Sequence, residues 1–329
     1  MQPLPDGSLA VALRLDGVLQ TIETIDPELG PLVIGRIKYL AKLKTYEHSL
    51  PQDGRINQTD SGIDQELRVS TYPTVAGEKI VIRFFSEQAA PHLSELGIDL
   101  HTLERIQNFL DSGRGLMLLT GPSGSGKTTT IYACLSTLLQ STSRHIITVE
   151  DPVERIIPGI MQTEVNEARG LDYPKAIRHL LRQDPEVIVI GEIRDDKTAD
   201  IAIRAALTGH QVIATLHAGS CHAVIDRLRL MVKDTFAIAT VLDLIVNQRL
   251  VRKLCPSCTG NGCGSCQQTG YQGRTPLVET LSFADEDRKQ LRQGETPAAT
   301  PSPTLSEAAE RLMARGITNE SEIARCLGS

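Results

Sequence analysis

Residues 121–128 read Gly-Pro-Ser-Gly-Ser-Gly-Lys-Thr and fit the phosphate-binding pattern G-x-x-x-x-G-K-[ST]. An apolar run at 115–120 precedes this loop and predicts a short buried strand, and residues 128–139 predict a helix. Glycines in such a loop let backbone N–H groups wrap a phosphate, and the positive end of the following helix favours the same charge. The strand–loop–helix pattern therefore predicts a nucleoside triphosphate site rather than an ordinary glycine-rich turn.

The loop also predicts individual roles. Lys127 would reach the β- and γ-phosphates, and the Thr128 hydroxyl would ligate Mg²⁺. The expected nucleotide-binding residues of the loop are Gly121, Ser123, Gly124, Ser125, Gly126, Lys127, Thr128 and Thr129.

The larger, C-terminal part of the chain alternates helical and strand-like patterns, which is typical of an α/β fold with a doubly wound parallel sheet. The expected helices lie at 100–112, 127–140, 172–182 and 196–208, and the expected strands at 115–119, 145–149, 186–190 and 211–215. Further along, the pattern predicts mainly helix at 219–250, a mobile connection at 293–304, and short helices at 305–315 and 319–327.

The N-terminal part predicts a separate small α/β domain. Its expected elements are a hairpin at 9–22 around Asp16-Gly17, a helix at 27–47, and strands at 54–58, 63–71 and 78–85. We therefore expect an N-terminal domain at 1–87, a linker at 88–98 and an ATPase domain at 99–329.

Composition narrows the class of protein. The chain has 329 residues and a net charge of −6, and only 3% of its residues are aromatic. This balance disfavours a direct nucleic-acid partner. No apolar run approaches the roughly 18 residues of a membrane span, and the N-terminus does not resemble a secretory signal. These features predict a cytoplasmic protein.

Acidic side chains follow two other expected strands, and ligands of α/β sheets bind at the carboxyl ends of strands. Glu192 follows the run 187–190, and Glu150 and Asp151 follow 146–149, with Glu154 close behind. We expect Glu192 to order the metal or its water and Glu150 to activate the attacking water. The alternative is that these residues are ordinary surface acids at strand ends.

Two histidines flank the expected strand 211–215. His217 follows it, at the same edge as the acidic residues, so it could contact the γ-phosphate, although a lone histidine after an apolar run is more often structural. His210 precedes the strand and is expected at the opposite edge, in a structural role.

Four ordered segments share a pattern with known proteins: Gly121–Thr129, Ile147–Glu154, Leu181–Asp195 and Thr208–His217. They resemble the Walker A, Asp box, Walker B and His box of the secretion ATPase superfamily, specifically the type II secretion and type IV pilus assembly ATPases. The likeness continues at residues 50–55, 67–73, 77–83 and 270–274.

This resemblance implies a hexameric ATPase with a RecA-like P-loop domain and a smaller PAS-like N-terminal domain. It further implies that the N-terminal domain contributes Arg55, Arg68 and Arg83 to the phosphates when the domains close, because guanidinium groups stabilise the charge that phosphoryl transfer develops. Arg194 could instead contact a neighbouring subunit. The implied partner is a membrane platform protein at the inner face of the bacterial plasma membrane, and the implied function is pilus or pseudopilus assembly.

Four of the seven cysteines form two C-x2-C pairs, Cys255 with Cys258 and Cys263 with Cys266. This spacing is typical of a structural tetrahedral Zn²⁺ site, and an Fe–S cluster is the alternative. By the resemblance, such pairs favour an assembly-type ATPase over a retraction-type one, although the spacer of four residues is shorter than in many relatives. The remaining cysteines, Cys134, Cys221 and Cys326, are expected to be ordinary thiols.

The chain starts almost inside the first domain of the resemblance, so we expect a short member that lacks the additional N-terminal domain of larger secretion ATPases. Three alternatives remain open at this stage. They are a retraction motor, a DNA-coupled conjugation motor, and a zinc-bearing scaffold that binds ATP without turnover.

Overall fold

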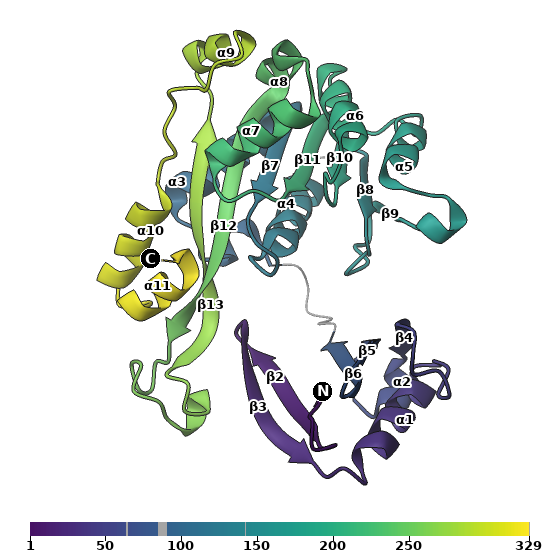
Figure 1. The fold of residues 1–329 in the computed structure, drawn as a ribbon. Helices are drawn as coiled ribbons and strands as arrows, with labels where there is room; N and C mark the ends of the chain where they lie inside the picture. Colours follow the sequence, from purple (N-terminus) through teal and green to yellow (C-terminus); the bar gives the residue numbers. More distant parts are fainter. Residues whose placement is uncertain (64, 85–90, 142, 329) are drawn as a thin grey trace. The chain divides into compact units, whose positions relative to one another are not determined.

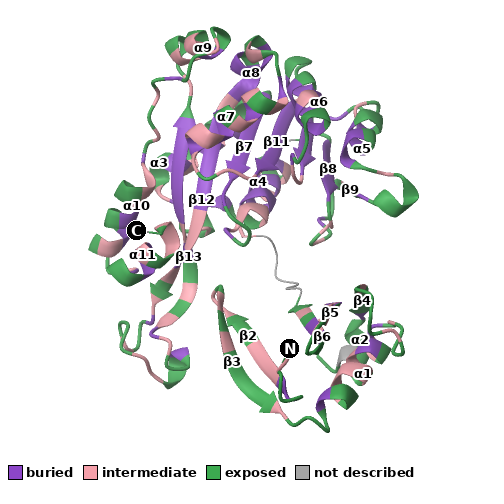
Figure 2. Ribbon diagram, in the orientation of Figure 1, coloured by how far each residue is buried: buried purple, intermediate pink, exposed green. Residues whose placement is uncertain are grey.

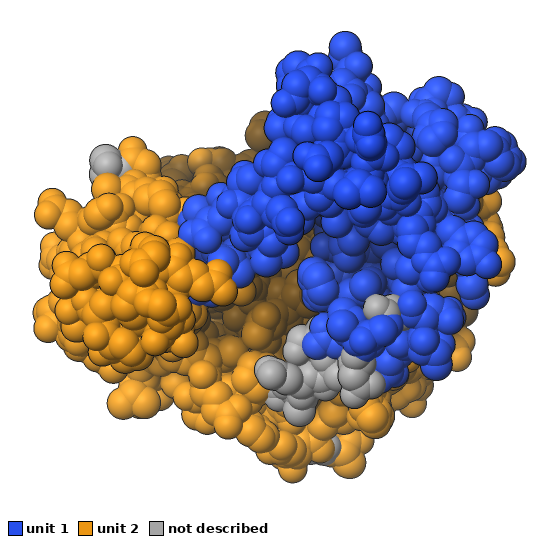
Figure 3. All heavy atoms as spheres, turned by 90° about the horizontal axis from the view of Figure 1, so that it is seen from below, with its two compact units in different colours: residues 1–89 blue, residues 90–329 orange. Residues whose placement is uncertain are grey.

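The computed structural model describes residues 1–63, 65–84, 91–141 and 143–328. The chain divides into two compact units, Met1–Ala89 and Ala90–Ser329 (Figure 3). The expected linker at 88–98 lies partly outside the described residues, and Leu93–Glu95 within it form a short 3₁₀ helix, η1. Among the described residues, none of the helices combines the length and apolar character that a membrane crossing requires.

Unit 1 contains two three-stranded antiparallel sheets, with strand orders β1-β2-β3 and β4-β5-β6. The expected hairpin is confirmed, because β2 and β3 join through Asp16 and Gly17, both at positive φ. The expected helix at 27–47 is shorter, since the chain leaves it at Leu40 and Lys42 adopts a φ of 58°. The elements are β1 (Gln2–Pro3), β2 (Leu9–Leu15), β3 (Val18–Ile25), α1 (Gly30–Leu40), β4 (Gln52–Ile56), α2 (Gln58–Ser61), β5 (Leu67–Thr74) and β6 (Gly77–Phe84).

Unit 2 is built on a seven-stranded sheet in the order β13-β12-β7-β11-β10-β8-β9 (Figure 1). All neighbouring pairs are parallel except β12 with β13. The expected α/β fold with a mostly parallel sheet is therefore confirmed. The strands are β7 (Gly115–Thr120), β8 (Ile146–Glu150), β9 (Met161–Glu164), β10 (Val187–Ile190), β11 (Gln211–Leu216), β12 (Leu242–Leu254) and β13 (Tyr271–Ser282).

Helices cover both faces of this sheet, and its four central strands β7, β8, β10 and β11 are buried (Figure 2). Successive residues of β7 face opposite layers: Leu116 and Leu118 pack with α5 to α8, whereas Met117 and Leu119 pack with α3 and α4. The helices are α3 (Leu100–Ser112), α4 (Lys127–Ser141), α5 (Tyr173–Leu180), α6 (Asp196–Leu207), α7 (Cys221–Met231), α8 (Thr235–Val241), α9 (Asp285–Arg292), α10 (Leu305–Ala314) and α11 (Glu320–Leu327).

The expectation of mainly helix at 219–250 is wrong for its last part. After α7 and α8 the chain forms β12, which pairs in parallel with β7 and continues to Leu254. A short buried apolar run does not distinguish helix from strand by its period, and here pairing with the central strand decides the outcome. β9 and β13 are further strands that the pattern does not predict.

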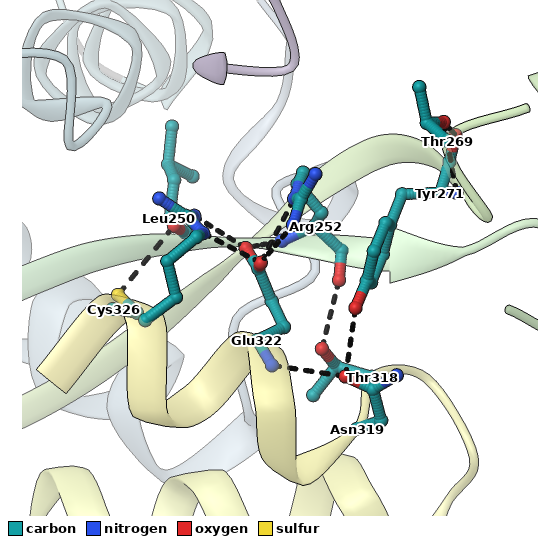
Figure 4. A network of polar contacts seen from close by, with 9 residues as sticks. Leu250, Arg252, Thr269, Tyr271, Thr318, Asn319, Glu322 and Cys326 are labelled. Atoms are coloured by element: carbon teal, nitrogen blue, oxygen red, sulfur yellow. Dashed lines mark hydrogen bonds and ion pairs between the residues drawn. The ribbon is translucent and has the colours of Figure 1, made fainter. Parts of the chain in front are cut away.

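The C-terminal helices α10 and α11 confirm the last two expected helices and pack against β12 and β13. A buried carboxylate, Glu322 on α11, accepts hydrogen bonds from the backbone and guanidinium of Arg252 on β12, at 2.7–2.9 Å (Figure 4). Arg252 also stacks on the Tyr271 ring, 3.9 Å from its centroid. Although burial opposes ionisation, hydrogen bonds from Arg325 and Arg252 lower the pKa of Glu322 to about 2. This network fixes the end of β12 beside the cysteine segment.

Candidate functional site

The phosphate-binding loop lies between β7 and α4, at the edge of the sheet where the parallel strands end. Gly121, Gly124 and Gly126 have φ of 138°, 75° and 90°, a region that favours glycine. A Cβ atom on Gly121 would lie 2.2 Å from the Gln248 carbonyl oxygen. Gly121 and Gly126 are therefore required because a Cβ atom at either position would clash with Gln248 of β12, as well as by the backbone conformation.

The loop forms one wall of a pocket of about 440 Å³. The predicted residues Ser123, Gly124, Ser125, Gly126, Lys127, Thr128, Thr129, Glu150, Glu192 and His217 all line it. Gly121 does not line the pocket, but its carbonyl oxygen accepts a hydrogen bond from Lys127. One end of each of four strands thus contributes to a single cavity, as expected for parallel strands that end at one edge.

Lys127 is the cation of this pocket that the loop motif predicts. Its Nζ donates to the carbonyl oxygens of Gly121 and Pro122, at 2.9 and 3.0 Å. Burial lowers the pKa of Lys127, and Arg249 acts in the same direction, while Glu192 opposes both. Nearby, the Ser125 hydroxyl is buried and has no hydrogen-bond partner among the described residues. An unsatisfied buried hydroxyl and a cation in a glycine cradle fit an anionic ligand such as a nucleotide phosphate.

Glu192 is the centre of a charged network at the carboxyl end of β10. One carboxylate oxygen lies 3.1 Å from His217 Nε2, and the other accepts from Arg194 Nε at 2.7 Å. Arg194 also contacts Asp151 at 3.2 Å, and His217 Nδ1 lies 3.2 Å from the Gly121 carbonyl oxygen. The network therefore connects the ends of three strands to the first residue of the phosphate loop.

Glu150 has a different environment from Glu192, because it is 6% exposed and accepts three hydrogen bonds. The donors are Tyr132 Oη at 2.6 Å, Thr148 Oγ1 at 2.5 Å and Gln162 Nε2 at 3.0 Å. Burial and the adjacent carboxylate raise the pKa of Tyr132, so this phenol remains a donor. Glu150 is thus held in one orientation at the pocket wall, and its role in activating water stays a prediction.

In unit 1 the three predicted arginines form one row across the second sheet. Arg55 is paired with Arg68, and Arg68 with Arg83, in the register of β4, β5 and β6. Residues paired in this way project from the same face, opposite to the face where Leu67 and Val69 are buried. Glu66 offsets part of this charge, 3.4 Å from Arg55. Guanidinium groups bind phosphate oxygens bidentately, so three of them on one face are chemically suited to an anion.

The four cysteines predicted to bind metal are brought together between β12 and β13. Their sulfur atoms lie within 4.8 Å of one another, and three of the separations are 3.7–3.8 Å. A tetrahedral metal with bonds of about 2.3 Å to sulfur has edges of about 3.8 Å, so the donor set fits zinc. Burial opposes ionisation of Cys266, but N–H groups of Cys263 and Gly270 lower its pKa to about 6. The short spacer is compatible with this geometry.

A family model described as type II/IV secretion system protein matches residues 5–325. The chain belongs to this family. Among its relatives are type II secretion system protein HxcR of Pseudomonas aeruginosa, 42% identical over 96% of this chain and 70% of that protein, and type II secretion system ATPase E of Vibrio cholerae, 37% identical over 97% and 69%. Type IV pilus assembly ATPase PilB of Thermus thermophilus is 39% identical over 87% of this chain and 35% of its own length.

Two solved structures share the fold of this chain. The pilus retraction motor PilT with bound ADP matches with a TM-score of 0.70 and 25% identity, over 98% of this chain and 91% of that one. The ATPase DotB of Legionella pneumophila matches with a TM-score of 0.68 and 22% identity, over 97% and 90%, and shows the fold alone. The four motif segments therefore identified the family correctly.

Several residues of this family member's pocket are missed by sequence reasoning. Leu250 of β12 and Arg274 of β13 line the pocket, and Arg249 donates to the Gly219 carbonyl oxygen at 2.8 Å, in the turn after His217. Tyr132 is missed because it lies within an otherwise apolar helical pattern. The residues of β12 are missed because the segment is expected to be helical. The likeness noted at 270–274 was the one available signal for Arg274.

The other residues singled out in the sequence lie as follows. His210 is at the opposite end of β11 from His217, and its Nδ1 lies 2.9 Å from the Ala205 carbonyl oxygen. Glu154 lines the nucleotide pocket. Cys134 and Cys221 are buried, and Cys326 is half-buried, all outside the four-cysteine cluster.

Proposed function

We propose that this secretion-family protein hydrolyses ATP to power pilus or pseudopilus assembly. The observation that carries the proposal is the single pocket in which the phosphate loop, Glu192, His217 and the buried Glu150 meet. Lys127 would contact the β- and γ-phosphates, and Thr128 would hold Mg²⁺, which supplies charge neutralisation at the phosphates. Glu192 would order the metal-bound water, and Glu150 would activate the nucleophile. The names of the relatives support the role in secretion and pilus machines.

The two units of the chain support different roles for its two parts. We propose that unit 1 is the N-terminal domain and unit 2 the ATPase domain, and that Arg55, Arg68 and Arg83 reach the phosphates when the domains close. Closure would then be coupled to hydrolysis, because the arginines complete the site only in that state. The protein would act as a homo-hexamer on a platform protein at the inner face of the plasma membrane, without contacting nucleic acid directly.

Glu192→Gln tests the hydrolytic site. We expect the ATPase rate to fall at least about 10²-fold, because the substitution removes the charge that pairs with Arg194 and His217 and orders the metal-bound water. Nucleotide affinity should be retained, since the phosphate loop is unchanged. Phosphate release and fluorescent ADP binding measure the two quantities.

The matched control for Glu192→Gln is Glu310→Gln, which removes an exposed carboxylate on α10. It should leave both phosphate release and ADP affinity at the wild-type level. Wild-type turnover in Glu192→Gln would contradict the assignment.

We also propose that Cys255, Cys258, Cys263 and Cys266 bind structural Zn²⁺. Purified protein should contain about one equivalent of zinc, and Cys255→Ser should lose it and melt at a lower temperature, because a four-coordinate site stabilises the fold around it. Cys326→Ser, outside the cluster, should keep the metal. Iron with visible absorbance would instead indicate an Fe–S cluster, and no metal in reduced, unchelated protein would refute the site.

A further inference from the structure

One face of β12 changes character at the level of the phosphate loop. Leu244 and Val246 project from this face into the apolar layer beneath α3 and α4. Two residues further on, at the next position of the same face, stands Gln248, which is 1% exposed. A buried amide in an apolar row costs free energy unless its hydrogen bonds are satisfied, so its partners are informative.

Both ends of the Gln248 amide have partners in or next to the loop. Its Nε2 donates to the Ser125 carbonyl oxygen at 2.8 Å, and its Oε1 accepts from the Thr130 hydroxyl, also at 2.8 Å. Ser125 belongs to the loop, and Thr130 lies in the first turn of α4. The amide therefore joins the loop to the helix whose N-terminus faces the phosphate site.

The fit around this amide is close. A Cβ atom on Gly126 would lie 2.7 Å from Gln248 Nε2, and one on Gly121 would lie 2.2 Å from the Gln248 carbonyl oxygen. Gln248 thus leaves no room for a side chain at either of these two loop glycines. A donor and an acceptor are both needed at this length of side chain, a combination that glutamine supplies.

We infer that Gln248 is a positioning residue, whose side-chain amide holds the phosphate-binding loop in the conformation that binds nucleotide phosphates. The inference rests on the proposed nucleotide site and adds a residue from outside its motifs. Gln248 acts through the Ser125 carbonyl and Thr130, which keep the N–H groups of the loop directed at the phosphate. Gln248 itself does not touch the nucleotide.

The test measures Mg²⁺–ADP affinity and melting temperature on the full chain. Gln248→Met keeps the length and neutrality of the side chain but removes both hydrogen bonds, so the Kd for ADP should rise about 10- to 100-fold. Thr130→Val removes one partner and should raise the Kd about 5-fold, whereas Thr130→Ser keeps the hydroxyl and should restore wild-type affinity. In turnover, the KM for ATP should rise more than kcat falls.

Val246→Ala is the matched control, because Val246 is buried on the same face of the same strand and does not line the pocket. It should lower the melting temperature while leaving the Kd for ADP within about twofold of wild type. Wild-type affinity in Gln248→Met would overturn the inference and leave the proposed function intact, whereas a wild-type chain that fails to bind ADP would refute the proposed function. If Gln248→Met does not fold, equal affinities of Thr130→Val and Thr130→Ser would overturn the inference.

Discussion

Arg68→Ala is expected to lower the ATPase rate about 10³-fold or more while leaving the chain folded. Arginines that reach a transferring phosphoryl group contribute rate factors of roughly this size. In the sheet of unit 1, Arg68 is the middle of three arginines in register, between Arg55 and Arg83. Like charges directly opposite each other in a sheet are unfavourable, so the sheet does not depend on the charge of Arg68 beside Arg55 and Arg83. The variant should therefore lose activity while unit 1 remains folded.

Steady-state phosphate release and thermal melting without nucleotide give the two readouts. Arg36→Ala, which removes an exposed arginine on α1 of the same unit, should change neither of them appreciably. Arg68→Lys should recover little activity, because an ammonium group lacks the planar fork that bridges phosphate oxygens. A variant that keeps its rate would contradict the role of Arg68 at the phosphates, and one that loses both rate and stability would show that Arg68 has a structural role in the sheet.

Lys127→Ala is expected to reduce turnover about 10²- to 10³-fold and to weaken nucleotide binding. The side chain supplies the positive charge of the loop, and it also holds the Gly121 and Pro122 carbonyl oxygens. Its loss would therefore remove the proposed phosphate contact and also the two hydrogen bonds to the loop carbonyl oxygens. This combined effect differs from that of Glu192→Gln, which should leave affinity intact.

Lys175→Ala is the control for Lys127→Ala, because Lys175 also donates to a backbone carbonyl, that of Gly170, but on the surface. Nucleotide binding by equilibrium fluorescence and turnover by phosphate release should both be normal in this control. Substantial ATPase activity in Lys127→Ala would remove the loop from the mechanism.

Much of unit 2 could be predicted because its signals are local. The helix at 100–112 has the expected bounds, and the strands β7, β8, β10 and β11 lie within a residue of expectation. Each is a short buried apolar run next to a turn or an amphipathic helix, so neighbouring residues suffice to define it. Neighbouring residues do not define β12 in this way, because its apolar start fits either a helix or a buried strand until its partner β7 is known.

Some residues of the candidate site could likewise be predicted from local sequence, and others could not. The phosphate site at 121–128 can be predicted from local sequence, because glycines at fixed spacing before a helix start can form a phosphate cradle wherever the chain places them. The C-x2-C pairs likewise predict a shared metal from spacing alone. By contrast, Gln248 belongs to a strand far along the chain and no local pattern marks it, and Arg274 is marked only by the likeness at 270–274.

The sequence by itself thus determined the family and the phosphate-loop motif, and it located the acidic strand ends, the paired cysteines and the three arginines as candidate site residues. Only the tertiary structure decided that those arginines stand in one row, that Glu150 is enclosed by three donors while Glu192 pairs with Arg194 and His217, and that β12 supports the loop. The physical reason is that a motif fixes chemistry over a few adjacent residues, whereas hydrogen-bond partners and strand neighbours depend on which distant segments the sheet places side by side.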